Sequence, residues 1–231
     1  MKFFHPTEPI FRRKQEALDV QDLKGLLQLH LQIQEKKLVS LLYTRIDQVF
    51  VLWGLICAAI FFTAQFAPIS WTAQAIFWSV LSVAGCIGMS VLTNFWVKIE
   101  HLRWVLYGWV ALMLIGVVVT DLGIFLGWGW VLMNLCNLWL VLSALGYIFT
   151  GIGMRSRAFI LAAIVHIAAI FLLPYVAGYQ FLATGIAMTA TLLIFAETQW
   201  DMRPPLEEND RLTAKQQQFN KEQYKLRQAS L

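Results

Sequence analysis

The chain has 231 residues, of which 58% are hydrophobic and 14% are charged. A soluble domain is about half apolar and about a quarter charged, so this composition argues against a soluble single domain. The 18 Lys and Arg exceed the 14 Asp and Glu, and the net charge of +4 acquires a meaning only once these residues are located. Length and composition together indicate a polytopic membrane protein.

The first 48 residues form a charged arm ahead of the first long apolar run. Between Gln15 and Gln48 the apolar residues mostly recur at steps of three and four, which predicts a long amphipathic helix. Gly25 weakens such a helix by about 1 kcal/mol relative to Ala. Two interpretations are open: the helix lies in the membrane interface and leads into the first span, or it packs on a protein partner or a second copy of the chain. We favour the first.

Six segments are long and apolar enough to cross the membrane, because a helix needs about 20 residues to span roughly 30 Å of hydrocarbon. They are Val49–Phe66, Trp71–Val97, Trp104–Leu126, Trp130–Thr150, Phe159–Pro174 and Tyr179–Ala196. The breaks between them are short, so neighbouring spans are antiparallel. The predicted fold class is therefore all-α: a polytopic integral membrane protein with six transmembrane helices in three antiparallel hairpins, preceded by the amphipathic helix. The predicted regions are an arm (1–48), a transmembrane domain (49–199) and a polar tail (200–231).

The basic residues give the orientation, since Lys and Arg collect in cytoplasmic loops. Eight precede the first span, two lie between the second and third spans, two lie between the fourth and fifth, and six lie in the tail. All 18 therefore fall on one side, and the three loops of the other side have none. We expect both termini to be cytoplasmic, or on the equivalent side of an internal membrane.

Aromatic residues mark where the spans meet water, because Trp prefers the interfacial layer. Trp71, Trp128 and Trp130 are assigned to the outer interface, and Trp96, Trp104 and Trp200 to the inner one. The tail that follows is Gln-rich, and we expect a solvated or partly helical extension.

Polar residues inside the spans are the strongest functional clue, because each costs free energy in lipid. Asp121 lies near the outer end of the third span, and Asn134 and Asn137 lie one turn apart on the fourth at a similar depth. One interpretation is a solute or ion contact, or a proton-carrying carboxylate. The other, which we favour, is a set of inter-helix hydrogen bonds worth about 0.6 kcal/mol each.

His166 falls near the middle of the fifth span. It lacks a second His for bis-His haem ligation, which leaves a single axial ligand to haem or chlorophyll, a solute contact, or a hydrogen bond to Thr189 or Thr191 of the next span. We favour the hydrogen bond. In the loop before this span, Arg155 and Arg157 are expected at lipid phosphates.

The three cysteines lie in apolar spans without metal-ligand spacing, and we interpret them as packing residues. We therefore predict no metal site and no cofactor. No catalytic signature stands out, nor any nucleic-acid-binding motif. The sequence favours a non-catalytic membrane protein, an accessory or assembly subunit whose partners are the bilayer and a protein or second copy held through the N-terminal helix. The alternative is a small-solute or ion transporter or channel using Asp121, Asn134 and Asn137.

Overall fold

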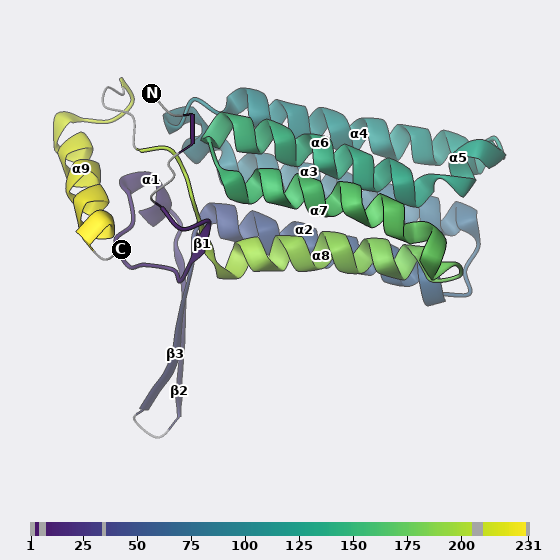
Figure 1. Cartoon of the computed structure of the whole chain (residues 1–231), viewed down its shortest axis with the longest axis horizontal. Helices are drawn as coiled ribbons and strands as arrows, with labels where there is room; N and C mark the ends of the chain where they lie inside the picture. Colours follow the sequence, from purple (N-terminus) through teal and green to yellow (C-terminus); the bar gives the residue numbers. More distant parts are fainter. Residues whose placement is uncertain (1–2, 5–7, 34–35, 205–209, 230–231) are drawn as a thin grey trace.

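The computed structural model describes residues 3–4, 8–33, 36–204 and 210–229. Six long helices lie side by side, and most of the smaller elements gather at one end of them (Figure 1). The six are α2 (Arg45–Phe66), α3 (Trp71–Ile99), α4 (Arg103–Phe125), α6 (Leu135–Met154), α7 (Arg157–Leu172) and α8 (Gln180–Glu197). The others are β1 (Phe11–Arg12), α1 (Val20–Leu23), β2 (Leu27–Ile33), β3 (Lys36–Tyr43), α5 (Gly129–Met133), η1 (Leu173–Val176), β4 (Gln199–Trp200) and α9 (Ala214–Ala229).

All six predicted spans are confirmed as helices that are long and apolar enough to cross a membrane. They alternate in direction as three antiparallel hairpins, and many large apolar side chains on their outer faces are exposed. A surface of this kind is stable against lipid and not against water. The chain is therefore an all-α integral membrane protein that contacts the bilayer.

Local sequence signals explain where the spans begin and end. At the start of α2, Thr44 and Asp47 form a capping box in which each side chain accepts from the other's backbone N–H. Gly127 has a φ of +65° in the turn after α4, a conformation that suits Gly. The fourth predicted span is interrupted near its N-terminal end, because Asn134 leaves helical geometry between α5 and α6.

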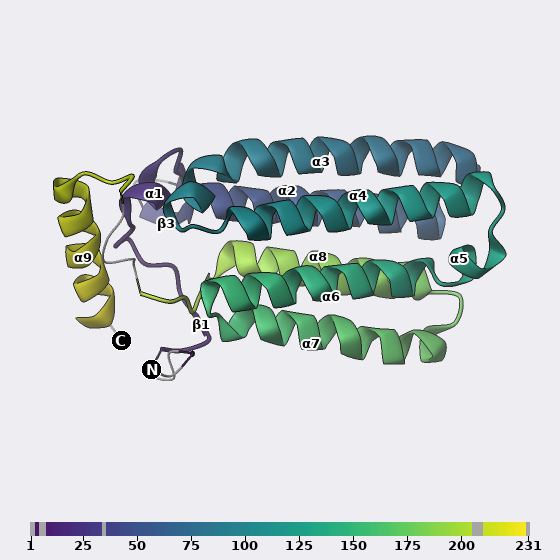
Figure 2. The same ribbon diagram turned by 90° about the horizontal axis from the view of Figure 1, so that it is seen from above.

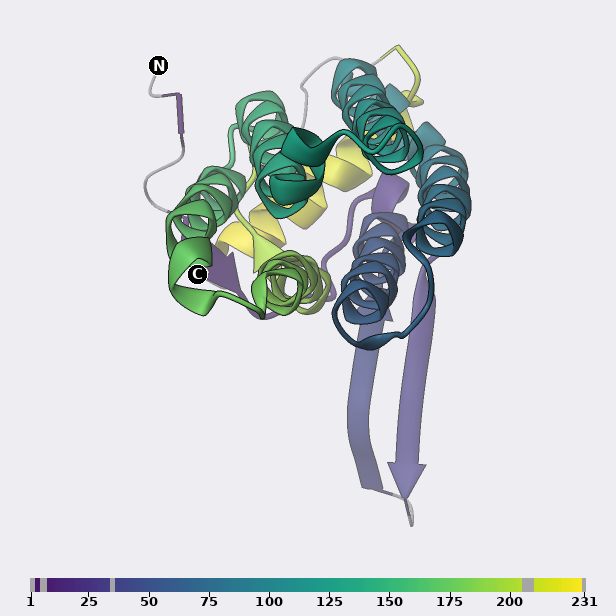
Figure 3. The ribbon, with the colours of Figure 1, turned by 90° about the vertical axis from the view of Figure 1, so that its right-hand side faces the viewer.

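The spans pack as a ring. Contacts run from α2 to α3, to α4, to α6, to α8 and back to α2, while α7 packs on the outside of α6 and α8 (Figure 3). Close approaches rest on small residues: a Cβ on Gly146 of α6 would lie 2.5 Å from the Trp109 ring of α4. Aromatic side chains fill the space between the spans at one end of the bundle, where the Phe159 and Phe195 side chains stack with centroids 4.4 Å apart.

The long N-terminal amphipathic helix is a wrong prediction. Residues 15–48 form the short helix α1, the antiparallel hairpin β2–β3 and the first turn of α2. From Leu27 to Ile33 the sequence alternates strictly between apolar and polar residues, which is the period of a strand. The leucines fit the helical period as well, and the strand period prevails after the break at Gly25, whose φ is +75°.

β1, α1, β4 and α9 cover the end of the bundle where α2, α4 and α7 begin. We call this covering layer the cap; it comprises residues 8–24, 198–204 and α9 (Figure 2). β1 pairs with β4, joining the N-terminal arm to the chain after α8. The tail predicted as solvated or partly helical contains α9, which packs on α1. The β2–β3 hairpin leaves the capped end sideways, across the direction of the helices (Figures 1 and 3).

Candidate functional site

The predicted polar cluster at the uncapped end divides into two separate sets of hydrogen bonds. Asp121 of α4 accepts from the Ser79 hydroxyl of α3 at 2.8 Å. Asn137 donates to the Asn134 side chain at 3.0 Å, and Asn134 donates to the Trp130 carbonyl at 2.9 Å. The two amides therefore share a face, as predicted, but their partners come from their own stretch of chain. The Asp121 carboxylate is instead bonded to α3.

His166 is fully buried against the Tyr147 ring, with ring centroids 4.9 Å apart. The expected hydrogen bond to Thr189 or Thr191 is wrong: His166 Nδ1 lies 2.8 Å from the Ala162 carbonyl of its own helix. The two threonines bond to the backbone of Gly54 and Ala187 instead. The other ring nitrogen, Nε2, is buried without a hydrogen-bond partner among the described residues.

The arginines expected at lipid phosphates have different environments. Arg155 is exposed in a left-handed conformation with a φ of +52°, and its guanidinium lies 5.5 Å from the Phe3 ring centroid. Its contact with lipid phosphate stays a prediction. Arg157 instead pairs with Asp201, Nε to Oδ2 at 2.8 Å, so protein groups satisfy much of its hydrogen bonding.

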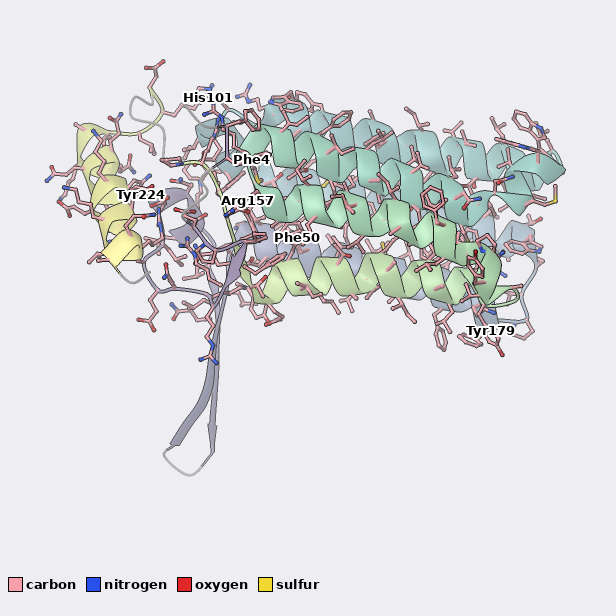
Figure 4. All side chains as sticks on the ribbon, in the orientation of Figure 1. Phe4, Phe50, His101, Arg157, Tyr179 and Tyr224 are labelled. Atoms are coloured by element: carbon pink, nitrogen blue, oxygen red, sulfur yellow. The ribbon has the colours of Figure 1, made fainter. Side chains whose placement is uncertain are left out.

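The carboxylate of Asp201 accepts hydrogen bonds at the N-terminus of α7, although Asp201 lies 44 residues away in sequence from the first turn of this helix. Its carboxylate accepts from the Ser156 hydroxyl at 2.9 Å and from the backbone N–H groups of Arg157 and Ala158 at 3.1 Å. Arg157 also donates to the Glu8 carbonyl on the N-terminal arm. Asp201 is 2% exposed, so this buried carboxylate and its partner Arg157 tie the arm, the C-terminal segment and a span together. Arg157 lies at the capped end of the bundle (Figure 4).

Three further carboxylates in the capped end are each held by a cation. The three pairs join segments far apart in sequence and are mostly buried: two fix the cap to the ends of α2 and α3, and the third holds two parts of the cap together. The pairs are Lys14–Asp47 at 2.9 Å, Arg203–Glu100 at 3.5 Å and Arg227–Asp19 at 3.0 Å. The last is bidentate, with both Nη atoms of Arg227 on the two oxygens of Asp19.

A chain of amide hydrogen bonds connects α9 to the end of α3. Asn220 donates to the Gln21 side chain at 3.0 Å, and Gln21 donates to the Glu100 carboxylate at 2.8 Å. Asn220 also accepts from the Val20 backbone at 2.9 Å. Asn220, Gln21 and Glu100 are all buried, so α9 is docked by specific polar contacts.

Asp22 is a half-buried carboxylate outside these ion pairs. Its Oδ1 accepts from the Trp96 indole N–H at 2.9 Å. Burial, followed by the negative charge of Asp19, raises the pKa of Asp22 to about 7. Trp96 is only 5% exposed, so its assignment to an inner aromatic belt is wrong. Its indole lies between the cap and the bundle.

Two cavities lie at this boundary. The cap cavity, of about 120 Å³, is lined by polar and charged side chains that include Arg12, Asp22 and Asp47. The bundle cavity, of about 130 Å³, lies inside the ring of spans and is lined mainly by apolar and aromatic side chains. Ile46 and Trp96 line both, so these two side chains border the cap cavity and the bundle cavity alike.

Among the described residues, no group of three His, Cys, Asp or Glu side chains is placed to hold a metal ion. The cap carboxylates are largely occupied by cations and amide donors. No protein-family model, curated protein or solved structure matches the chain.

Sequence reasoning missed the whole capped-end site. Its charged residues come from the arm, the ends of α2 and α3, and the tail. In the sequence, the number of basic residues in these segments indicates only the orientation of the chain in the membrane. One signal was available: Asp47 and Glu100 each stand at the end of an apolar span, where a carboxylate is either hydrated or paired.

Proposed function

We propose that the protein is a non-catalytic, multi-pass accessory subunit of a membrane complex, which contacts a neighbouring membrane protein through the β2–β3 hairpin. The hairpin carries this proposal, because it forms a sheet of its own and pairs with no other strand among the described residues. An isolated two-stranded hairpin is marginally stable in water, and free strand edges are templates for further pairing. A covering surface and an edge partner would stabilise it.

Lipid is the natural cover for one face of the hairpin. Tyr43, at the end of β3, donates its hydroxyl to Glu197 at the end of α8, so the face that carries Tyr43 is the one beside the bundle. The register places Leu41 and Val39 at alternate positions along the same strand, across from Leu29 and Leu31 on β2. The alternation of apolar and polar residues along β2, at the level where the spans end, suits the membrane interface.

With one face on lipid, the strand edges remain for protein. Edge pairing gives affinity through backbone hydrogen bonds, which is the mode of β-strand addition. A neighbour within the same membrane would meet this edge directly, because the hairpin runs sideways from the bundle (Figure 3). We propose further that the capped end is cytoplasmic, since the three loops at the uncapped end hold no Lys or Arg.

The test is purification of the tagged chain from its native membranes in mild detergent. Two variants are compared: one in which residues 28–42 are replaced by an Asn-Gly turn, and a control with Lys221→Ala and Glu222→Ala on the exposed side of α9. The proposal predicts a stoichiometric partner with wild type and control that is lost from the hairpin variant. A monodisperse lone chain, or a partner retained by the hairpin variant, would contradict it.

Transport is the less favoured alternative. Asp121 is engaged by Ser79, and the cavity beside it measures about 20 Å³, which is room for about one water molecule. Asn134 and Asn137 bond each other. No described feature at the uncapped end favours a passage for solute.

A further inference from the structure

The two cavities differ sharply in chemistry although they share a boundary. One is polar and lies in the cap, and the other is mainly apolar and lies among the spans. We propose that together they form a binding site for a single-chain anionic amphiphile, with its head group in the cap cavity and its hydrocarbon end in the bundle cavity.

Arg12 is the residue that selects an anionic head group. It lines the cap cavity, and its Nε and Nη1 are buried without a hydrogen-bond partner among the described residues. The other three cations that line this cavity each have a carboxylate partner: Lys14, Arg203 and Arg227. Unpaired buried donors of a guanidinium are costly, and a carboxylate or phosphate oxygen satisfies them with charge-assisted hydrogen bonds.

Among the carboxylates, Glu8 has the strongest electrostatic interaction with Arg12, and Glu8 also lines the cap cavity. Glu8 accepts a hydrogen bond from the Gln228 side chain of α9 at 2.7 Å, so a donor other than Arg12 satisfies the Glu8 carboxylate. Burial lowers the pKa of Arg12, yet an arginine stays charged in proteins. The cavity therefore keeps a cation whose donors are available to a ligand.

The bundle cavity is suited to a short hydrocarbon segment. Its volume of about 130 Å³ is close to that of an engineered apolar cavity of about 150 Å³ that stays dry and binds benzene. Trp53, Met113 and Trp139 contribute to its lining from three different spans. It takes a segment of about six carbons by this comparison.

Trp96 and Ile46 join the two halves of the site. The indole of Trp96 borders the bundle cavity, while its N–H donates to Asp22, which lines the cap cavity. A ligand that occupies both cavities passes these two side chains. Octanoate matches the site in charge and length, and octyl phosphate carries a phosphate head group on an alkyl chain one carbon longer.

Binding is measured by equilibrium dialysis of radiolabelled octanoate against the full chain in nanodiscs, with empty nanodiscs as background. Octyl phosphate and octanol are tested as competitors. The variant Arg12→Gln removes the cation, and Arg13→Gln is its matched control because Arg13 is exposed. Ser143→Leu fills the bundle cavity from α6, with the lipid-facing substitution Val118→Leu as control.

The proposal predicts one saturable octanoate site per chain. Arg12→Gln weakens binding about tenfold or more, as expected for loss of hydrogen bonds to a charged group. Ser143→Leu also weakens it, while both controls bind as wild type. Stronger competition by octyl phosphate than by unlabelled octanoate identifies the ligand class as phosphate rather than carboxylate.

Three results would overturn the proposal: no saturable binding above empty nanodiscs, unchanged affinity in folded Arg12→Gln, or competition by octanol as strong as by octanoate. If Arg12→Gln does not fold, Ser143→Leu decides, because wild-type affinity in that folded variant removes the bundle cavity from the site.

Discussion

Replacement of Asp201 by Ala tests how the cap is held to the bundle. The substitution removes the acceptor of two backbone N–H groups, the Ser156 hydroxyl and the Arg157 guanidinium in one step. Loss of a helix cap costs about 0.5–2 kcal/mol. Breaking a buried ion pair costs about 3–5 kcal/mol, and this upper range is reduced here because the Arg157 side chain is 27% exposed. We expect a loss of about 2–4 kcal/mol of unfolding free energy.

The assay is reversible unfolding in mild detergent, followed by circular dichroism. For a chain of this length each kcal/mol shifts the midpoint by about 2–4 °C, so Asp201→Ala should unfold roughly 4–16 °C lower. Asp201→Asn keeps one acceptor oxygen and should lose less. Asp210→Ala is the matched control, because Asp210 is exposed in the same part of the chain. If Asp201→Ala unfolds within 1 °C of the control, the explanation that Asp201 holds the cap to the start of α7 is refuted.

Three other predictions concern the cap, the ring of spans and the buried histidine. Folding raises the pKa of Asp22 to about 7, so the contribution of this group to the free energy of unfolding is present below about pH 4, the ordinary pKa of Asp, and is lost as the pH rises through about 7. In thermal unfolding between pH 5 and 8, Asp22→Asn should therefore show a flatter pH dependence than wild type and should be the more stable form at pH 8. Gly146→Ala should cost about 1–3 kcal/mol because its Cβ meets the Trp109 ring, whereas Gly129→Ala, with no atom within 4 Å, should unfold as wild type does; equal midpoints would contradict the packing. His166→Leu removes a buried unsatisfied nitrogen and should leave stability unchanged or raised, and the purified wild type should show no visible absorption band; a haem or chlorophyll spectrum lost in this variant would make His166 an axial ligand.

The spans could be predicted from sequence because the signal is local: about 20 consecutive apolar residues suffice to identify each one. The arm could not, because its leucines satisfy two periods. The segment from Leu27 to Ile33 fits a strand, while Leu23, Leu27 and Leu31 also fit one face of a helix. Pairing of β2 with β3 decides between them, and pairing is not a property of one segment.

The capped-end site could not be predicted for a related reason. Asp201 caps a helix whose first residue precedes it by 44 positions, and Asn220 bonds Gln21 across 199. Such contacts depend on where the β1–β4 pair places the tail, and no spacing rule in the sequence encodes that. In the predicted polar cluster, Asp121 accepts a hydrogen bond from Ser79 of α3, a residue without a signal of its own.

The central claim is that the hairpin touches a membrane neighbour, and in-membrane cross-linking tests it most directly. A photoreactive amino acid replaces Gln28, which is exposed at the start of β2, or Lys221 on α9 as the control. Irradiation of native membranes should give one discrete protein adduct from position 28 and none of that size from position 221. Absence of a protein adduct at position 28, or the same adduct from both positions, would contradict the account.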